Sequence, residues 1–286
     1  MAAKRIFGWL RELLGLYRLY AAMDLRWFLH DRATCAVVIA SEFISNIASI
    51  SGVFLLAVRF DGVGALSADE VLFMLGFFEL AGGFLNMMFG NLNVLNISRR
   101  VGRGQVDHML IQPRPLIMQL LTEGFMPVTG SSAFLVGIVL TVVSCLRLGI
   151  SVDIAWICAF IVYVLCHSAI KMGQSFLYGA AAFYRPVACE ELSSMVLDMN
   201  SMIGQYPLAG LPGWAMAFLT TVFPVGLLAY VPALILLGKL EKGMYMALPV
   251  AVAAAFMAAA VLAFRKGLRH YAQNSCNRYR SMGHRS

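Results

Sequence analysis

The chain has 286 residues, of which 60% are hydrophobic and only 13% are charged, and its mean hydropathy is +0.77. A soluble domain needs charged residues at about a quarter of its positions, so the composition excludes an ordinary soluble enzyme and indicates that lipid covers much of the outside. The net charge of +7 does not indicate nucleic acid, because the basic residues gather at the ends of apolar runs and form no stripe interleaved with aromatic residues.

Residues 1–32 predict an amphipathic helix and not a cleaved signal peptide, because six basic residues interrupt the segment. Apolar side chains recur between them at helical spacing. They are Ile6, Leu10, Leu13, Leu14, Tyr17 and Tyr20. We expect this helix to lie in the membrane interface, with its basic face toward anionic head groups. The alternative is a helix that packs on the protein core.

About six apolar runs follow, each close to the roughly 20 residues that cross a bilayer. The clearest spans are at about 34–58, 70–95, 125–146, 154–182 and 244–264. Residues 187–237 are predicted as a fifth span in chain order, followed by a broken, partly re-entrant hairpin. The reason is that Pro224 and Pro232 each remove a helical hydrogen bond.

The predicted fold class is therefore an all-α polytopic membrane protein. It has one membrane domain at residues 33–266, preceded by the amphipathic helix and followed by a basic tail at 267–286. Orientation follows from lysine and arginine, which are enriched on the cytoplasmic side. The segments predicted to face the cytoplasm contain 17 of these residues, against four in the links predicted to lie outside. Both termini are expected in the cytoplasm.

Residues 96–116 form the most polar internal segment, and we expect a short helix there on the cytoplasmic side. Glycines precede the helix, Asp107 lies near its positive end, and the run Pro113-Arg114-Pro115 ends it. Such a helix could dock into a groove of a soluble partner. The alternative is an ordinary solvated loop.

Three ionisable residues fall inside predicted spans, where insertion of a charge costs about 2.5–3.5 kcal/mol. They are Glu42, Glu79 and Lys171. At a rise of about 1.5 Å per residue, Glu42 and Lys171 match in depth and predict an ion pair, and Glu79–Lys171 is a looser alternative. The pair is either a structural lock between helices or part of a substrate path.

Motifs for catalysis or nucleotide binding are absent from the sequence, which contains no GxxxxGK[ST], HExxH, GxSxG or GxGxxG. The pair Glu190-Glu191 resembles the start of an intramembrane protease motif, EExxxR, but the required arginine position is Met195. The six cysteines form no CxxC pair and the five histidines have no ligand spacing. No metal, cofactor or catalytic residue is predicted in this chain.

Two segments resemble a permease family of the ATP-binding-cassette (ABC) type-2 exporter superfamily. The run GRGQVDHMLIQPRPLIMQLL (102–121) is similar to the family's G-x-x-D-x-x-L-x-x-P-x-P loop. The run YPLAGLPGWAMAFLTTVFPVGLLAYVPALILLG (206–238) is similar to its Tyr-Pro, Pro-x-Trp, Phe-Pro and Tyr-x-Pro-Ala series. One departure is Ala229, where family members usually have an asparagine beside the last tyrosine.

The resemblance implies a permease subunit in the bacterial inner membrane that works as a dimer, with itself or with a sister permease. Each half would sit on a separate ABC ATPase, which would bind ATP and magnesium. The coupling helix would use Gly102, Arg103, Gly104, Asp107, Leu110, Pro113, Arg114 and Pro115. The re-entrant hairpin would contain Tyr206, Pro207, Pro212, Trp214, Pro224, Tyr230 and Pro232. Residues 4–31 would form the connecting elbow helix.

Two other functions remain compatible with the sequence. One is a polytopic enzyme acting on lipid, which would need catalytic polar residues clustered at one membrane face. The other is a passive channel or a non-catalytic assembly subunit. Binding of an ATPase would distinguish the export permease from both. The substrate is not readable from the sequence.

Overall fold

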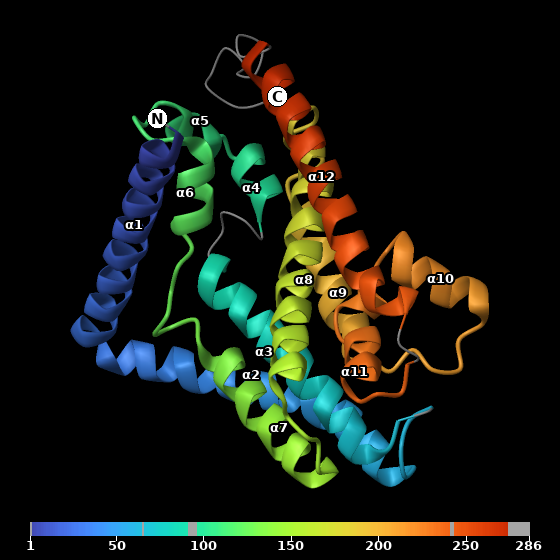
Figure 1. The fold of residues 1–286 in the computed structure, drawn as a ribbon. Helices are drawn as coiled ribbons and strands as arrows, with labels where there is room; N and C mark the ends of the chain where they lie inside the picture. Colours follow the sequence, from blue (N-terminus) through green and yellow to red (C-terminus); the bar gives the residue numbers. More distant parts are fainter. Residues whose placement is uncertain (1, 65, 91–95, 241–242, 274–286) are drawn as a thin grey trace.

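The computed structural model describes residues 2–64, 66–90, 96–240 and 243–273, and within these ranges the regular structure is helical apart from one isolated bridge. The long helices are α1 (Ala2–His30), α2 (Arg32–Arg59), α3 (Ala68–Phe89), α7 (Ser132–Leu148), α8 (Ile154–Gly179) and α12 (Met244–Gln273). The short ones are α4 (Ile97–Gly102), α5 (Gln105–Leu110), α6 (Leu116–Thr122), η1 (Ala180–Phe183), α9 (Leu192–Gly204), α10 (Gly213–Thr221), η2 (Val225–Leu227) and α11 (Tyr230–Leu236). Figure 1 shows their arrangement.

Polar side chains mark where several of these helices begin. Asp31 caps α2, and the Asp153 carboxylate accepts a hydrogen bond of 2.7 Å from the Trp156 backbone N–H at the start of α8. Ser67 and Glu70 form a reciprocal capping box on α3. Each cap satisfies an N–H group that the first helical turn leaves without a partner. The helix boundaries therefore follow from local sequence.

Four helical segments are long and apolar enough to cross a membrane, and they confirm the polytopic fold class. They are Arg32–Arg59, Ala68–Phe89, Ile154–Phe183 and Met244–Gln273. A further pair, Gly213–Thr221 and Val225–Leu236, is bent by 72° and becomes a fifth candidate if it is counted as one span. The predicted break near Pro224 is present at this bend. Whether the bent pair is re-entrant stays a prediction.

The total of six spans also stays a prediction, because two predicted spans are shorter than expected. The third begins at Ser132 and not near residue 125, since Pro127 and Gly130 lie in a run of turns that delays the helix. The fifth corresponds to α9, which has 13 residues and is about 20 Å long. That length is less than the roughly 30 Å hydrocarbon core.

The core is built around α3, which is apolar on nearly all sides and buried along most of its length. Such a helix needs neighbours on all faces, and α7 and α8 pack against it. Phe77 of α3 meets Phe160 of α8 edge to face, with ring centroids 5.3 Å apart. A second apolar cluster joins α4, α5 and α6 to η1 and the end of α12.

Helix α1 packs against the protein along one side and exposes apolar residues along another. Leu16 is buried, and the Tyr17 hydroxyl donates to the Leu121 carbonyl at 3.0 Å. Leu10 and Leu14, two of the predicted interface residues, are exposed. Both the core-facing and the interface interpretation thus describe a part of this helix, and its place in the interface stays a prediction.

The last helix, α12, extends past the predicted end of the last span at about residue 264, and the predicted start of the basic tail at residue 267 stays a prediction. It continues to Gln273 because Tyr271 is buried there and packs edge to face on Phe183, with ring centroids 5.4 Å apart. The rest of the predicted basic tail, residues 274–286, lies outside the described residues. So do the predicted end of the second span at 91–95 and Lys242.

Candidate functional site

The predicted short helix in the polar segment is α5, and its boundaries agree with the glycine and proline signals. Gly104 precedes it in the left-handed conformation (φ 72°), which residues with a Cβ adopt only at a cost. Asp107 lies in its first turn. The helix ends at Leu110, before the exposed run from Pro113 to Pro115.

This segment presents an exposed surface at one end of the molecule. Leu110 is 45% exposed and Ile111 is 80% exposed, and Arg114 is also exposed. The buried Gln119 amide holds the turn by donating to the carbonyls of Met109 and Arg114, both at 2.9 Å. Figure 1 places α5 at the same end as the start of α1 and the end of α12.

Replacement of Gly104 by alanine is expected to lower the free energy of unfolding by about 1–2 kcal/mol, the cost of a left-handed conformation for a residue with a Cβ. Thermal unfolding of the purified chain would measure the loss. Gly52→Ala in α2 is the control, since no atom lies within 4 Å of its Cβ position. An equal loss in both variants would contradict the assignment of strain to Gly104.

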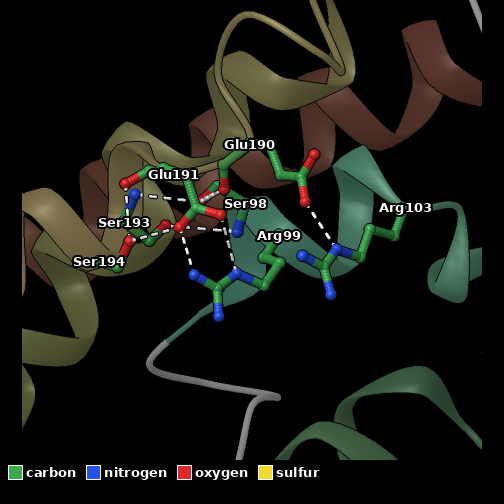
Figure 2. A network of polar contacts seen from close by, with 7 residues as sticks. All are labelled: Ser98, Arg99, Arg103, Glu190, Glu191, Ser193 and Ser194. Carbon is green, nitrogen blue, oxygen red and sulfur yellow. Dashed lines mark hydrogen bonds and ion pairs between the residues drawn. The ribbon is translucent and has the colours of Figure 1, made fainter.

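Two ion pairs join α4 to the residues that precede α9 (Figure 2). Arg99 donates two hydrogen bonds to the Glu191 carboxylate from one edge of its guanidinium group, from Nε to Oε1 at 3.0 Å and from Nη2 to Oε2. Arg103 Nε donates to Glu190 Oε1 at 2.6 Å. We call these four residues the Arg–Glu clamp. The fork of a guanidinium and the two oxygens of a carboxylate fix direction as well as distance.

A buried serine pair extends the clamp into the protein (Figure 2). The Ser193 backbone N–H donates to Ser98 Oγ at 3.0 Å, the Ser98 N–H donates to Ser193 Oγ at 3.3 Å, and Ser98 Oγ donates to the Glu190 carbonyl at 2.7 Å. Gly102 packs beside them, where a Cβ would lie 2.9 Å from the Pro186 carbonyl oxygen. These contacts leave little room for α4 to move without α9.

The Arg99–Glu191 pair of the clamp is formed at neutral pH. The hydrogen bonds from Arg99 and Ser194 lower the pKa of the Glu191 carboxyl below its ordinary value. A carboxyl group with a lowered pKa in the folded state stabilises that state above its ordinary pKa, and loses this contribution as the pH falls through the lowered value. Acid below the usual range of glutamate is therefore needed to open this pair.

The clamp is not evident in the sequence. There, Glu190 and Glu191 resemble only the start of a protease motif, and the family resemblance assigns Arg103 to the coupling helix. The available signal was charge: four arginines in one polar segment and two adjacent glutamates in another, both at predicted span ends on the same side. The polar segment is thus attached to the bundle as well as exposed.

The predicted ion pair between Glu42 and Lys171 is wrong. Glu42 accepts a hydrogen bond from Ser132 of α7 at 2.7 Å, because its side of α2 faces α7 and not α8. Lys171 instead faces a cavity that Glu79 also lines, and its ammonium lies 5.1 Å from the centre of the Phe78 ring. The looser alternative, Glu79 with Lys171, is the combination that the fold brings together.

The residues of the predicted hairpin divide into a buried and an exposed set. Pro207, Pro224, Tyr230 and Pro232 are buried, whereas Tyr206, Pro212 and Trp214 are exposed. Ala229, the departure from the family pattern, is fully buried. The proline at the bend therefore lies inside the protein, where irregular backbone can be accommodated at membrane depth. The hairpin role of these residues stays a prediction.

The described chain is a polytopic helical bundle with a polar helical segment anchored at one end. The family model described as ABC-2 family transporter protein matches residues 43–275, which is more than half of the chain. The chain therefore belongs to the ABC-2 transporter family and is a permease subunit of an ABC transporter, as the resemblance in two motifs indicated. Comparison with curated proteins and with solved structures finds no match.

Proposed function

We propose that this chain is the permease subunit of an ATP-driven exporter of the bacterial inner membrane. Two permease subunits, identical or sister chains, would form the path along which substrate moves outward. A separate ABC ATPase would bind ATP and magnesium and drive the change between two packings of the bundle. Both termini and the polar segment would face the cytoplasm.

The observation that carries this proposal is the exposed surface of α5 and the turn after it. Ile111 projects from a segment held by Gln119 on one side and by the Arg–Glu clamp on the other. A partner that pushes on this surface would therefore move α4 and α9 as well. Exposed apolar side chains on a braced segment are what a docking contact requires.

Ile111→Asp is expected to remove the ATPase from the complex, because a carboxylate would be buried without a partner at the interface. A loss of at least about tenfold in co-purified ATPase corresponds to 1.4 kcal/mol. Asp107→Arg tests the same surface by charge reversal. Both variants should still insert into the membrane.

Ile154→Asp is the matched control. Ile154 is 81% exposed, close to the 80% of Ile111, but it begins α8 at the other end of the bundle (Figure 1). It should leave ATPase binding unchanged. Normal co-purification and transport in Ile111→Asp and Asp107→Arg would remove the docking assignment.

A further inference from the structure

A half-open cavity of about 430 Å³ lies between the helices, within the roughly 300–1,000 Å³ range of small-molecule sites. Helices α2, α3, α8 and α9 contribute most of its walls. Several uncharged polar side chains line it, among them Asn46 and Ser49 of α2, Ser201 of α9 and Gln205, the residue that follows α9. Ser49 and Gln205 exchange hydrogen bonds of 2.9 and 2.7 Å across the two helices. These walls suit a ligand with polar groups.

Two opposite charges also face this cavity. Glu79 of α3 is 8% exposed and Lys171 of α8 is 7% exposed, so both are almost entirely removed from solvent. A charge in such a place is costly unless it is paired. Yet in the described part of the chain neither an ion pair nor a hydrogen bond joins Glu79 and Lys171 to each other or to another side chain.

The ring of Phe78 supplies Lys171 with a cation–π contact at 5.1 Å, which compensates only part of the lost hydration. Glu79 has no comparable neighbour among the described residues. The two charges therefore attract each other across the cavity while each keeps its hydrogen-bonding capacity. One molecule that carries both an ammonium and an acid group could satisfy both.

We propose that this cavity binds a zwitterionic group, with its ammonium on Glu79 and its carboxylate or phosphate on Lys171. The inference rests on the proposed function and names the substrate class of the permease. A ligand with a single charge would pair with one of these residues and leave the other uncompensated, which is the basis of selection against it. Amino-carboxylic acids and short peptides share this chemistry with ethanolamine phospholipid head groups.

The placement of the cavity gives the site a connection to the docking segment. Ser201 lies on α9 and Gln205 directly follows it, and the Arg–Glu clamp joins the start of this helix to α4. Movement of α5 would thus reach the cavity wall through one continuous helix. The binding step itself needs neither ATP nor the ATPase, so it can be measured separately.

The test uses the full chain in nanodiscs of phosphatidylglycerol, which offers no zwitterion. The probes are four compounds that share the aromatic ring. Phenylalanine carries both charges, its amide only the ammonium, its N-acetyl derivative only the carboxylate, and its N-acetyl amide neither. The dissociation constant of each follows from the shift of the thermal midpoint with concentration. We expect phenylalanine to bind at least about tenfold more tightly than the other three (1.4 kcal/mol).

Two variants then test which charge pairs with which residue. In Glu79→Gln the preference for phenylalanine over the N-acetyl acid should disappear, and in Lys171→Gln the preference over the amide should disappear. Destabilisation of the bundle alone would weaken the binding of all probes and would not remove one particular preference in each variant. Glu42→Gln is the matched control, because Glu42 is an intramembrane carboxylate bonded to Ser132 and should keep the wild-type order.

A second arm distinguishes the two sources of the zwitterion. If the ligand is a lipid head group, phosphatidylethanolamine nanodiscs should raise the midpoint of the wild type but not of Glu79→Gln or Lys171→Gln, and phenylalanine should have no effect. Gly82→Leu should abolish either response by filling the cavity. Gly82→Ala should not, because its Cβ would lie 3.9 Å from the nearest atom.

Absence of both the phenylalanine and the phosphatidylethanolamine response in the wild type would overturn the proposal. So would a response that both charge variants retain. These results are independent of the proposed function, since an ATPase that fails to co-purify leaves the binding measurements unchanged. If the chain binds the zwitterion selectively but no ATPase co-purifies with it, the exporter proposal is contradicted and the binding-site proposal stands.

Discussion

Gly137→Val is expected to eliminate the folded permease from the membrane. A Cβ at this position of α7 would lie 2.1 Å from the Leu80 backbone nitrogen of α3. The obstacle is backbone, so no side-chain rotation relieves it and the two helices must separate. Overpacking of a tight core costs about 1–3 kcal/mol even when side chains can shift. We expect a larger loss here, visible as degradation and loss of the monodisperse peak in detergent.

The same contact can be tested from the facing helix. Gly83 of α3 would place a Cβ 2.1 Å from the Phe134 backbone nitrogen of α7, so Gly83→Val should fail in the same way. Small residues at such crossings are what allow membrane helices to approach closely. Gly82→Ala, one position along, is the control and should accumulate normally. Normal accumulation of Gly137→Val would contradict the packing of α3 on α7.

Reversal of the two glutamates in the Arg–Glu clamp should abolish transport and leave the chain folded. In the variant Glu190→Arg with Glu191→Arg, four cations would repel one another where two ion pairs now join α4 to α9. Exposed ion pairs contribute little to stability, so membrane levels and ATPase binding should persist. The expected result is ATP hydrolysis without substrate movement, a loss of at least about tenfold in transport per ATP hydrolysed.

The complementary variant identifies the cause. Addition of Arg99→Glu and Arg103→Glu to that chain restores both pairs with opposite polarity, and transport should recover. The control is Glu12→Arg, a charge reversal at an exposed residue of α1, and it should leave transport unchanged. Transport that stays absent after the second reversal would show that the glutamates act through something other than the clamp.

The sequence predicted those parts of the fold that depend on local signals. Long apolar runs indicated α2, α8 and α12, and glycine followed by proline indicated α5. The length of α9 was not predictable, because the apolar run after residue 187 contains several prolines. Each proline can end a helix or only kink it, and the choice depends on what packs around it. The late start of α7 has the same origin.

The intramembrane charges show a different limit. Glu42 and Lys171 were paired because the rise per residue places them at the same depth along their helices. The rotation of α2 about its axis decides whether a side chain faces α7 or α8, and the rise per residue does not give this rotation. The Arg–Glu clamp, which joins positions more than 80 residues apart in the chain, depends on tertiary packing that no local pattern shows.

The buried carboxylate of Asp24 gives the first helix a mechanical role. It accepts hydrogen bonds from the backbone N–H groups of Val128 and Thr129, at 2.8 and 3.2 Å, and from the Thr129 hydroxyl at 2.5 Å. Movement of α1 would therefore also move the turn that precedes α7. Helix α7 in turn packs closely against the backbone of α3. A force applied to the N-terminal helix would therefore reach the close contact between α7 and α3 without passing through α5.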